Sequence, residues 1–254
     1  MLGYKSGIAE VLTKITILRD EFDTVHDTSP IEHVGSRLKS PESLLAKVRR
    51  KACPMTLEAI RAQIWDIAGV RVTCSFVSDI YRIRDLLVGQ PDLTVLAERD
   101  YIAEPKPNGY QSLHLIVTVP VFLSDRVEHV TVEIQIRTIA MDFWASLEHK
   151  IYYKYDGAVP QRLLAELKDA ALAASRLDAT MEQLHDEVRA LAAHPGATGQ
   201  GTPVHGTATD PTDPTSDLLV VAPEPLSRPG APSDEVLAAF AHLLQPHRPV
   251  PGAD

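Results

Sequence analysis

An acid, an amide and a base alternate along residues 130–138, VTVEIQIRT. If this segment is a β-strand, Glu133, Gln135 and Arg137 point to one face of a sheet, because strand side chains alternate between the two faces. A half-buried strand on a solvated sheet gives the same pattern without any function. The choice between a solvated face and a working one therefore depends on what the rest of the chain places beside these side chains.

Two other segments show the same period of two residues. Residues 70–76, VRVTCSF, place Arg71 on a polar face, and residues 112–118, SLHLIVT, place Ser112 and His114 opposite apolar neighbours. Three strands that carry Arg, His, Glu and Gln together form a charged surface, which a merely solvated sheet rarely needs. We therefore expect a binding surface on this side of the sheet.

Two carboxylates could meet on that surface. Asp66 lies just before segment 70–76, and Glu133 lies within segment 130–138, so the two acids converge if these strands are neighbours. A pair of carboxylates is the oxygen-rich arrangement that holds Mg²⁺ against the phosphates of a nucleotide. Phosphoryl transfer also needs cations for the charge on the transferred group. The candidate cations are Arg37, Lys39, Lys47, Arg50 and Arg71.

The segment before the second strand, EPKPNGYQSLH, reads as a stiff loop. Its two prolines restrict the backbone, and Asn108 and Gly109 supply a tight turn. The loop then delivers Lys106 and Tyr110 to the edge of the polar surface. Such a tyrosine can simply anchor the loop, but Tyr and Lys at this place are also what a stacked nucleobase and a phosphate would require.

The remaining periodicity predicts a mixed α/β domain, with flanking helices and a sheet of four or five strands. Ser40 and Pro41 form a typical helix start, as N-cap and first helical residue. The predicted helices cover residues 2–24, 31–39, 40–51, 56–69, 78–90 and 138–157, and the predicted strands cover 70–76, 93–98, 112–118 and 130–138.

A long helical extension should follow Pro160. Its apolar residues recur at alternating steps of four and three, which is a heptad pattern that suits either packing on its own domain or contact between subunits. The seam consists of Leu163, Leu167, Ala170, Ala174, Leu177, Met181, Leu184, Val188 and Leu191. From residue 195 onward the chain holds 11 of its 19 prolines, so we expect disorder over 195–254, with a short helix at 233–244.

Composition narrows the class of protein. With 44% hydrophobic and 23% charged residues the chain is typical of a globular protein, and no apolar run reaches the roughly 18 residues of a membrane helix. The N-terminus lacks the features of a secretory signal, so we expect a cytoplasmic protein. A net charge of −9 disfavours nucleic acid as a partner, whereas the six bases and three acids within residues 31–60 suit a small phosphorylated molecule.

Five stretches together resemble a known family: HVGSRLKSPESL, DIAGVRV, RDYIAEPKPNGYQSLHL, VEIQIRT and MDFWASLEHK. In order and spacing they are similar to the synthetase domain of the RelA/SpoT-type alarmone synthetases, also called GTP pyrophosphokinases. The resemblance covers about residues 4–156 and suggests a small, single-domain member with its synthetase domain at 1–157 and a heptad helix at 158–194. It implies a nucleotidyltransferase-like mixed sheet flanked by helices.

The resemblance also implies a reaction, the transfer of the β,γ-pyrophosphate of ATP to the 3′-hydroxyl of GDP or GTP. Asp66 would bind Mg²⁺, and Glu133 would assist the metal and accept the proton of the hydroxyl. Arg37 and Arg71 would enclose adenine, and Lys39, Lys47 and Arg50 would bind the ATP phosphates. Tyr110 would stack on guanine. The phosphates and remaining polar groups of the guanine nucleotide would be bound by Arg99, Lys106, His114, Gln135 and Asp142. Arg137 receives no role beyond a structural ion pair.

Three other functions compete with this one. Hydrolysis of the alarmone would need a separate metal domain, and the dipeptides His26-Asp27 and His185-Asp186 are too isolated to form one, so we expect no hydrolase activity. Toxic relatives pyrophosphorylate tRNA ends or adenine nucleotides, and the acidic balance disfavours the tRNA. A catalytically dead nucleotide sensor should lack Asp66 or Glu133, and both are present. By resemblance we expect a homotetramer, while the preference between GDP and GTP stays open.

Overall fold

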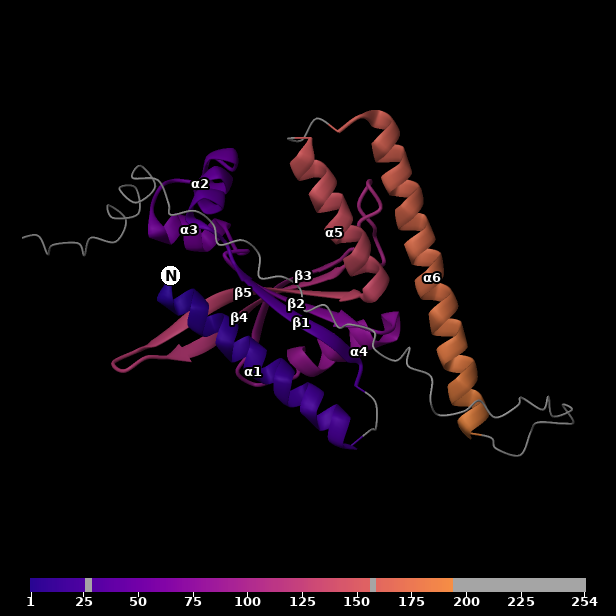
Figure 1. Cartoon of the computed structure of the whole chain (residues 1–254). Helices are drawn as coiled ribbons and strands as arrows, with labels where there is room; N and C mark the ends of the chain where they lie inside the picture. Colours follow the sequence, from indigo (N-terminus) through magenta and orange to yellow (C-terminus); the bar gives the residue numbers. More distant parts are fainter. Residues whose placement is uncertain (26–28, 156–158, 194–254) are drawn as a thin grey trace, which may run out of the picture.

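A five-stranded mixed sheet forms the centre of the molecule (Figure 1). The computed structural model describes residues 1–25, 29–155 and 159–193. The strands follow the order β1-β2-β5-β4-β3, in which β2 and β5 are parallel and every other pair is antiparallel. Their bounds are β1 Ile31–Leu38, β2 Ala68–Cys74, β3 Thr94–Asp100, β4 Leu113–Phe122 and β5 Val127–Thr138. The tail predicted to be disordered and the helix predicted at 233–244 lie outside the described residues.

Two helices cover the apolar face of this sheet. Helix α1 (Leu2–Val25) lies across β2, β4 and β5, and helix α4 (Val77–Val88) packs beside it on the same face (Figure 1). Val11 and Ile15 of α1 are fully buried, one turn apart, as the amphipathic spacing predicts. The opposite, polar face of the sheet is thus left for the site. Within the described ranges, no helix combines the length and the apolar character that crossing a membrane requires.

Four other helices frame the polar face. They are α2 (Pro41–Arg50), α3 (Leu57–Gln63), α5 (Ile139–Lys154) and α6 (Gln161–Ala193). Ser40 caps α2 as predicted, because its hydroxyl accepts from the Ser43 backbone N–H. The predicted helices at 2–24, 40–51, 78–90 and 138–157 are confirmed with shifts of a few residues at their ends.

The helix predicted over residues 31–39 is wrong, because this segment is strand β1. Its apolar residues Ile31, Val34 and Leu38 are spaced like one face of a helix. A β-bulge near the start of the strand explains that spacing, since the register with β2 shifts between Ile31 and His33. The bulge places Ile31 opposite Cys74 and Val34 opposite Val72, so both lie over the core despite an odd separation.

The helix predicted over residues 56–69 is too long. Thr56 caps it as expected, but α3 ends at Gln63, and Ile64 is already extended. The extended backbone places both Ile64 and Ile67 in a small buried apolar cluster with α2. As a result Asp66 lies in a short link immediately before β2.

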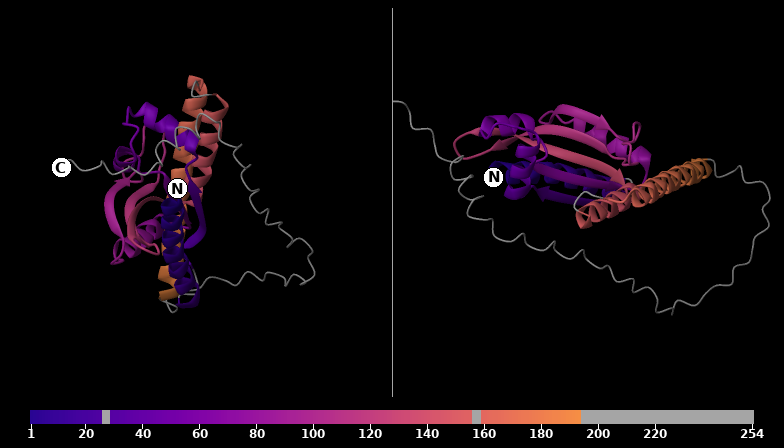
Figure 2. Two further views of the ribbon diagram at one scale, coloured as in Figure 1. Left: turned by 90° about the vertical axis from the view of Figure 1, so that its left-hand side faces the viewer. Right: turned by 90° about the horizontal axis from the view of Figure 1, so that it is seen from above.

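Helices α5 and α6 form an antiparallel pair beside the sheet (Figure 2). Trp144 of α5 donates its indole N–H to the Leu167 carbonyl of α6 at 2.8 Å, and the two residues share a buried cluster with Ala171. The predicted heptad seam packs inward only in part. Leu167 is buried, whereas Ala170, Leu184 and Val188 are exposed.

Candidate active site

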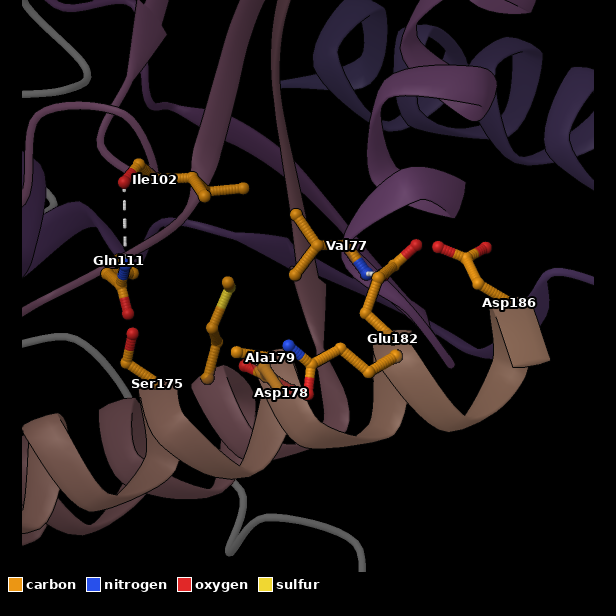
Figure 3. Close-up of a pocket in the computed structure, with 10 residues that line it drawn as sticks. Val77, Ile102, Gln111, Ser175, Asp178, Ala179, Glu182 and Asp186 are labelled. Carbon is orange, nitrogen blue, oxygen red and sulfur yellow. Dashed lines mark hydrogen bonds between the residues drawn. The ribbon is translucent and has the colours of Figure 1, made fainter.

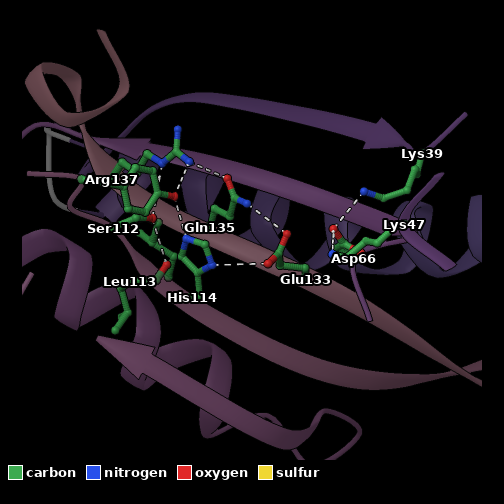
Figure 4. Close-up of polar contacts among 11 residues, drawn as sticks. Lys39, Lys47, Asp66, Ser112, Leu113, His114, Glu133, Gln135 and Arg137 are labelled. Atoms are coloured by element: carbon green, nitrogen blue, oxygen red, sulfur yellow. Dashed lines mark hydrogen bonds and ion pairs between the residues drawn. The ribbon is translucent and has the colours of Figure 1, made fainter. Parts of the chain in front are cut away.

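Strand register gathers the predicted polar residues on one face. Glu133 lies opposite Gly69, and Gln135 lies opposite both Arg71 of β2 and His114 of β4. Residues that face each other in neighbouring strands point to the same side of the sheet. The three polar strand faces predicted from alternation therefore form one surface, drawn in part in Figure 4.

Asp66 stands at one end of this surface, between two lysines. Its Oδ2 accepts from Lys39 Nζ at 2.9 Å and from Lys47 Nζ at 2.5 Å (Figure 4). Burial raises the pKa of Asp66, but the hydrogen bonds and charges of Lys47 and Lys39 outweigh burial and lower the pKa below its usual value. Asp66 is therefore a carboxylate at neutral pH.

A divalent cation fits the two carboxylates. Asp66 Oδ1 is buried and has no hydrogen-bond partner within the part of the chain that the structure describes. Figure 4 shows Glu133 and Asp66 next to each other on this surface, so their two negative charges repel each other. Mg²⁺ commonly takes one or two carboxylates and completes its shell with water and substrate phosphates. The unpartnered oxygen and the repulsion are both what a cation between Asp66 and Glu133 would relieve.

Glu133 is held at both of its oxygens. Oε1 lies 3.3 Å from His114 Nδ1, and Oε2 accepts from Gln135 Nε2 at 3.0 Å. Burial raises the pKa of Glu133, yet the contacts with His114 and Gln135 outweigh burial and lower the pKa. A half-buried carboxylate in a fixed orientation, ionised at neutral pH, can accept a proton from a bound hydroxyl.

The basic residues predicted for ATP lie on the β1–β2 side. Arg37 lies opposite Gly69 and Arg71 lies opposite Gly35, so both arginines project from the polar face. Arg71 Nη1 contacts Asp142 Oδ1 at 3.0 Å, whereas Arg37 is exposed. Arg50 is exposed at the end of α2, one turn beyond Lys47.

The residues predicted for the guanine nucleotide lie on the β4–β3 side. Gly109 has a φ of 89°, and its N–H donates to the Lys106 carbonyl at 2.8 Å, so the predicted tight turn is present. Lys106 Nζ lies 4.4 Å from the centroid of the Tyr110 ring. Arg99 is exposed on β3, directly opposite His114.

Comparison with known proteins gives this arrangement a family. Residues 36–158 match the model of the region found in RelA/SpoT proteins. The GTP pyrophosphokinase YwaC of Bacillus subtilis (strain 168) is 52% identical over 188 residues, which are 74% of this chain and 90% of that protein. The chain belongs to the RelA/SpoT family.

Solved structures of RelA/SpoT-family proteins confirm the predicted mixed α/β fold. The crystal structure of small alarmone synthetase 1 from Bacillus subtilis, bound to its product pppGpp, is 44% identical with a TM-score of 0.69. The matched region covers 73% of this chain and 94% of the chain in that crystal structure. Small alarmone synthetase 2 from the same organism is 50% identical with a TM-score of 0.67, over 73% of this chain and 96% of its own.

Sequence reasoning missed how fully Arg137 is engaged within this RelA/SpoT-family site. Its predicted ion pair is present, because Nη1 lies 3.1 Å from Asp142 Oδ1. The same guanidinium also donates to Ser112, Tyr110 and Gln135. Alternation placed Ser112 and Arg137 on the polar face, but no local pattern indicates that the sheet would bury an arginine there.

Proposed function

We propose that this RelA/SpoT-family chain is a GTP pyrophosphokinase, which transfers the β,γ-pyrophosphate of ATP to the 3′-hydroxyl of GDP or GTP. The product would be ppGpp or pppGpp, with AMP released. The observation that carries the proposal is the orientation of Glu133, held by His114 and Gln135 beside Asp66 on an open polar face. The 52% identity to a GTP pyrophosphokinase supports the same reaction.

Glu133 would act as the general base. Because its pKa is lowered, the carboxylate is unprotonated at neutral pH and can accept the proton of the 3′-hydroxyl as that oxygen attacks the β-phosphorus of ATP. A positioned base contributes about 10²–10⁴-fold to the rate. Asp66 and Glu133 would hold the divalent metal, which we propose to be Mg²⁺, and the bound cation would neutralise charge on the transferred group.

The lysines beside Asp66 would hold the ATP phosphates. Lys39 and Lys47 both contact a single carboxylate oxygen, so the two ammonium groups exceed the charge that they face. Phosphate oxygens would share this excess positive charge, together with Arg50 at the end of α2. Arg37 and Arg71 would lie against adenine, since both project from the same face two strands away from the guanine side.

The guanine nucleotide would occupy the other half of the surface. Tyr110 would stack on the base, and Lys106 lies over the tyrosine ring, within reach of a nucleotide that enters there. The phosphates and other polar groups of the nucleotide would contact four residues around this half of the surface: Arg99, His114, Gln135 and Asp142. His114 and Asp142 already contact Glu133 and Arg137, so their roles would combine binding with the support of neighbouring side chains.

A direct assay tests the proposal. The protein is incubated with ATP, Mg²⁺ and, in separate reactions, GDP, GTP or an adenine nucleotide as acceptor, and the products are resolved by chromatography. We expect AMP and a 3′-pyrophosphorylated guanine nucleotide. A product from the adenine acceptor alone would replace this proposal with the adenine-specific activity.

Glu133→Gln tests the assigned base in the same assay. The amide keeps the shape of the side chain but accepts protons poorly, so kcat should fall by about 10²–10⁴-fold. Glu128→Gln is the matched control. Glu128 lies on the same strand β5 but away from the polar surface, where its Oε1 lies 2.8 Å from Arg126 Nε. Equal activities of the two variants would remove the assigned role of Glu133.

The enzyme would act as an oligomer in the cytoplasm, where its nucleotide substrates are made. Leu177, Met181, Leu184, Val188 and Leu191 of α6 are exposed along one seam, which supports contact between copies through this helix. A tetramer is the form that we propose.

A further inference from the structure

The guanidinium of Arg137 is buried in the site and engaged at each of its nitrogens. Arg137 is only 6% exposed. Its Nε donates to Ser112 Oγ at 3.3 Å and its Nη1 donates to Asp142 Oδ1 at 3.1 Å. Its Nη2 donates to Tyr110 Oη and to Gln135 Oε1, both at 2.7 Å. One ion pair with Asp142 would not require this fixed fork of donors.

The contact of Nη2 with Gln135 determines how the Gln135 amide is oriented. A guanidinium has donors only, so the Gln135 atom that faces Arg137 must be the carbonyl oxygen. The amide nitrogen then points the other way, where it donates to Glu133 Oε2 at 3.0 Å (Figure 4). Without Arg137 the carboxylate alone would hold the amide, and the Gln135 side chain would lose the anchor that fixes its position.

The contact of Nη2 with Tyr110 determines the direction of donation along a longer chain of hydrogen bonds. The Tyr110 hydroxyl accepts from Arg137, so its own proton is free to go to His114 Nε2, 2.7 Å away. His114, which is 8% exposed, then carries its ring proton on Nδ1. That nitrogen lies 3.3 Å from Glu133 Oε1 and donates to it.

The two arms end on the two oxygens of a single carboxylate. We propose that Arg137 is the positioning residue for Glu133, acting on Oε2 through Gln135 and on Oε1 through Tyr110 and His114. Because Tyr110 is also the proposed platform for guanine, the same arms connect the guanine side of the site with the orientation of the base. This inference rests on the proposed function, but the hydrogen-bond chain itself can be measured without any turnover.

The first measurement is the tautomer of His114 in the protein without nucleotide. Nitrogen-15 NMR of the histidine-labelled chain distinguishes a ring protonated on Nδ1 from one protonated on Nε2, and the signal is assigned by its loss in His114→Gln. We expect the Nδ1–H form in the wild type. Tyr110→Phe keeps the aromatic ring but removes the hydroxyl, so Nε2 loses its donor. Because Nδ1 still donates to Glu133 Oε1, the Nδ1–H form should persist, while the Nε2 resonance should shift to that of an imidazole nitrogen without a hydrogen bond.

The second measurement is steady-state kinetics of Arg137→Lys and Tyr110→Phe with ATP and GDP. Lysine keeps the positive charge but has one nitrogen in place of the fork, so it cannot serve both arms. We expect kcat to fall by about 10²-fold for Arg137→Lys through loss of alignment, while KM for ATP changes by less than about twofold. Arg126→Lys, in the exposed β4–β5 turn, is the control and should match the wild type.

The outcomes separate this inference from the proposed function. If the wild type makes no product, the proposed function fails, but the His114 Nε2 resonance in wild type and Tyr110→Phe still decides whether the chain of hydrogen bonds exists. If the wild type carries the Nε2–H form, if Tyr110→Phe leaves the Nε2 resonance unchanged, or if Arg137→Lys leaves kcat unchanged while the protein is active, Arg137 does not position Glu133. A parallel loss of kcat and of melting temperature in Arg137→Lys, with unchanged His114 nitrogen resonances, would assign Arg137 a structural role only.

Discussion

Asp66 and Glu133 are both ionised, but different neighbours make them so. Two ammonium groups hold the Asp66 charge, whereas Glu133 depends on hydrogen bonds from a histidine ring and an amide. A carboxylate paired with two ammonium groups accepts a proton less readily than one that contacts a histidine ring and a neutral amide. The site thus separates the two roles at the level of single residues, with Asp66 suited to hold charge and Glu133 suited to exchange a proton.

Asp66→Asn should weaken both the fold and the activity. The variant leaves Lys39 and Lys47 without a counter-charge, at a cost of about 1–3 kcal/mol in the free energy of unfolding at pH 7. Because the folded pKa of Asp66 lies below 3.8, the wild-type advantage should be present above pH 3.8 and should be lost as the pH falls through the lower folded value. Urea unfolding as a function of pH measures this difference, and a difference that persists at the acid end would contradict it.

Tyr110→Ala should raise the KM for the guanine nucleotide. Stacking of a base on an aromatic ring contributes about 1–3 kcal/mol, so KM should rise by about 5- to 150-fold. Steady-state kinetics with GDP as the varied substrate measure the change, and KM for ATP serves as the internal reference. Phe122→Ala, which removes an exposed ring at the end of β4, should change neither value.

At the scale of the elements, α6 is fixed to α4 by a carboxylate. Glu182 accepts from the backbone N–H groups of Val77 and Ser78, at 2.8 and 3.2 Å, and so caps the N-terminus of α4. His185 stacks on Phe76 one turn further along, with ring centroids 4.1 Å apart. Figure 3 shows Glu182 and Val77 at the edge of a cavity of about 430 Å³ between α6 and the domain.

Glu182→Ala should loosen this junction. Loss of a helix N-cap costs about 0.5–2 kcal/mol, and α6 would also lose a contact with the domain. We expect faster amide hydrogen exchange at Val77 and Ser78 and along the C-terminal half of α6. Glu187→Ala, which removes an exposed carboxylate from the same helix, is the control. Unchanged exchange at α4 in Glu182→Ala would show that another group caps the helix.

Asp178 should make the same junction sensitive to pH. It is buried on α6 and accepts from Thr138 Oγ1 at 2.8 Å, and burial, followed by the charge of Glu182, raises its pKa. Since the raised pKa favours the protonated form in the folded state, the ionised form destabilises the fold at neutral pH, and this penalty disappears below pH 3.8. Asp178→Asn should therefore be more stable than the wild type at pH 7, with a gain that shrinks as the pH falls. Thermal unfolding across this range tests the sign.

Local sequence patterns predicted most of these elements and failed where tertiary structure overrides them. Alternation was enough to identify β2, β4 and β5, because their polar and apolar faces are separate. Strand β1 was mistaken for a helix because a bulge moved Ile31 onto the core face. The seam of α6 was visible in the sequence. Its inward side, however, also uses Asp178, Glu182 and His185, whose hydrogen-bond and stacking partners lie more than 30 residues away.

At the scale of the whole molecule, the site depends on a parallel pairing that no local pattern contains. Strands β2 and β5 are more than 50 residues apart in sequence, yet their register puts Glu133 beside Gly69 and the link that carries Asp66. The sequence supported two converging carboxylates only on the condition that these strands are neighbours. The sheet order meets that condition.

The outward seam of α6 leads to a prediction about assembly. Leu184 is 49% exposed and Val188 is 64% exposed, and they continue a heptad pattern that the domain itself does not cover. Burying such a seam against a second copy removes apolar surface from water, at about 25 cal/mol per Å². We therefore expect the wild type to form an oligomer and the double variant Leu184→Glu, Val188→Glu to be a folded monomer, because charge on both sides of the seam opposes the contact.

Light scattering coupled to size exclusion measures this change in mass, and circular dichroism confirms that the variant is folded. Ile17→Glu, which places a charge on an exposed site of α1, is the control and should retain the wild-type mass. Because Glu133 on β5 and Asp66 in the link before β2 belong to one chain, the monomeric variant should keep its reaction centre. A wild type that is already monomeric, or a double variant that still assembles, would show that α6 is not the contact.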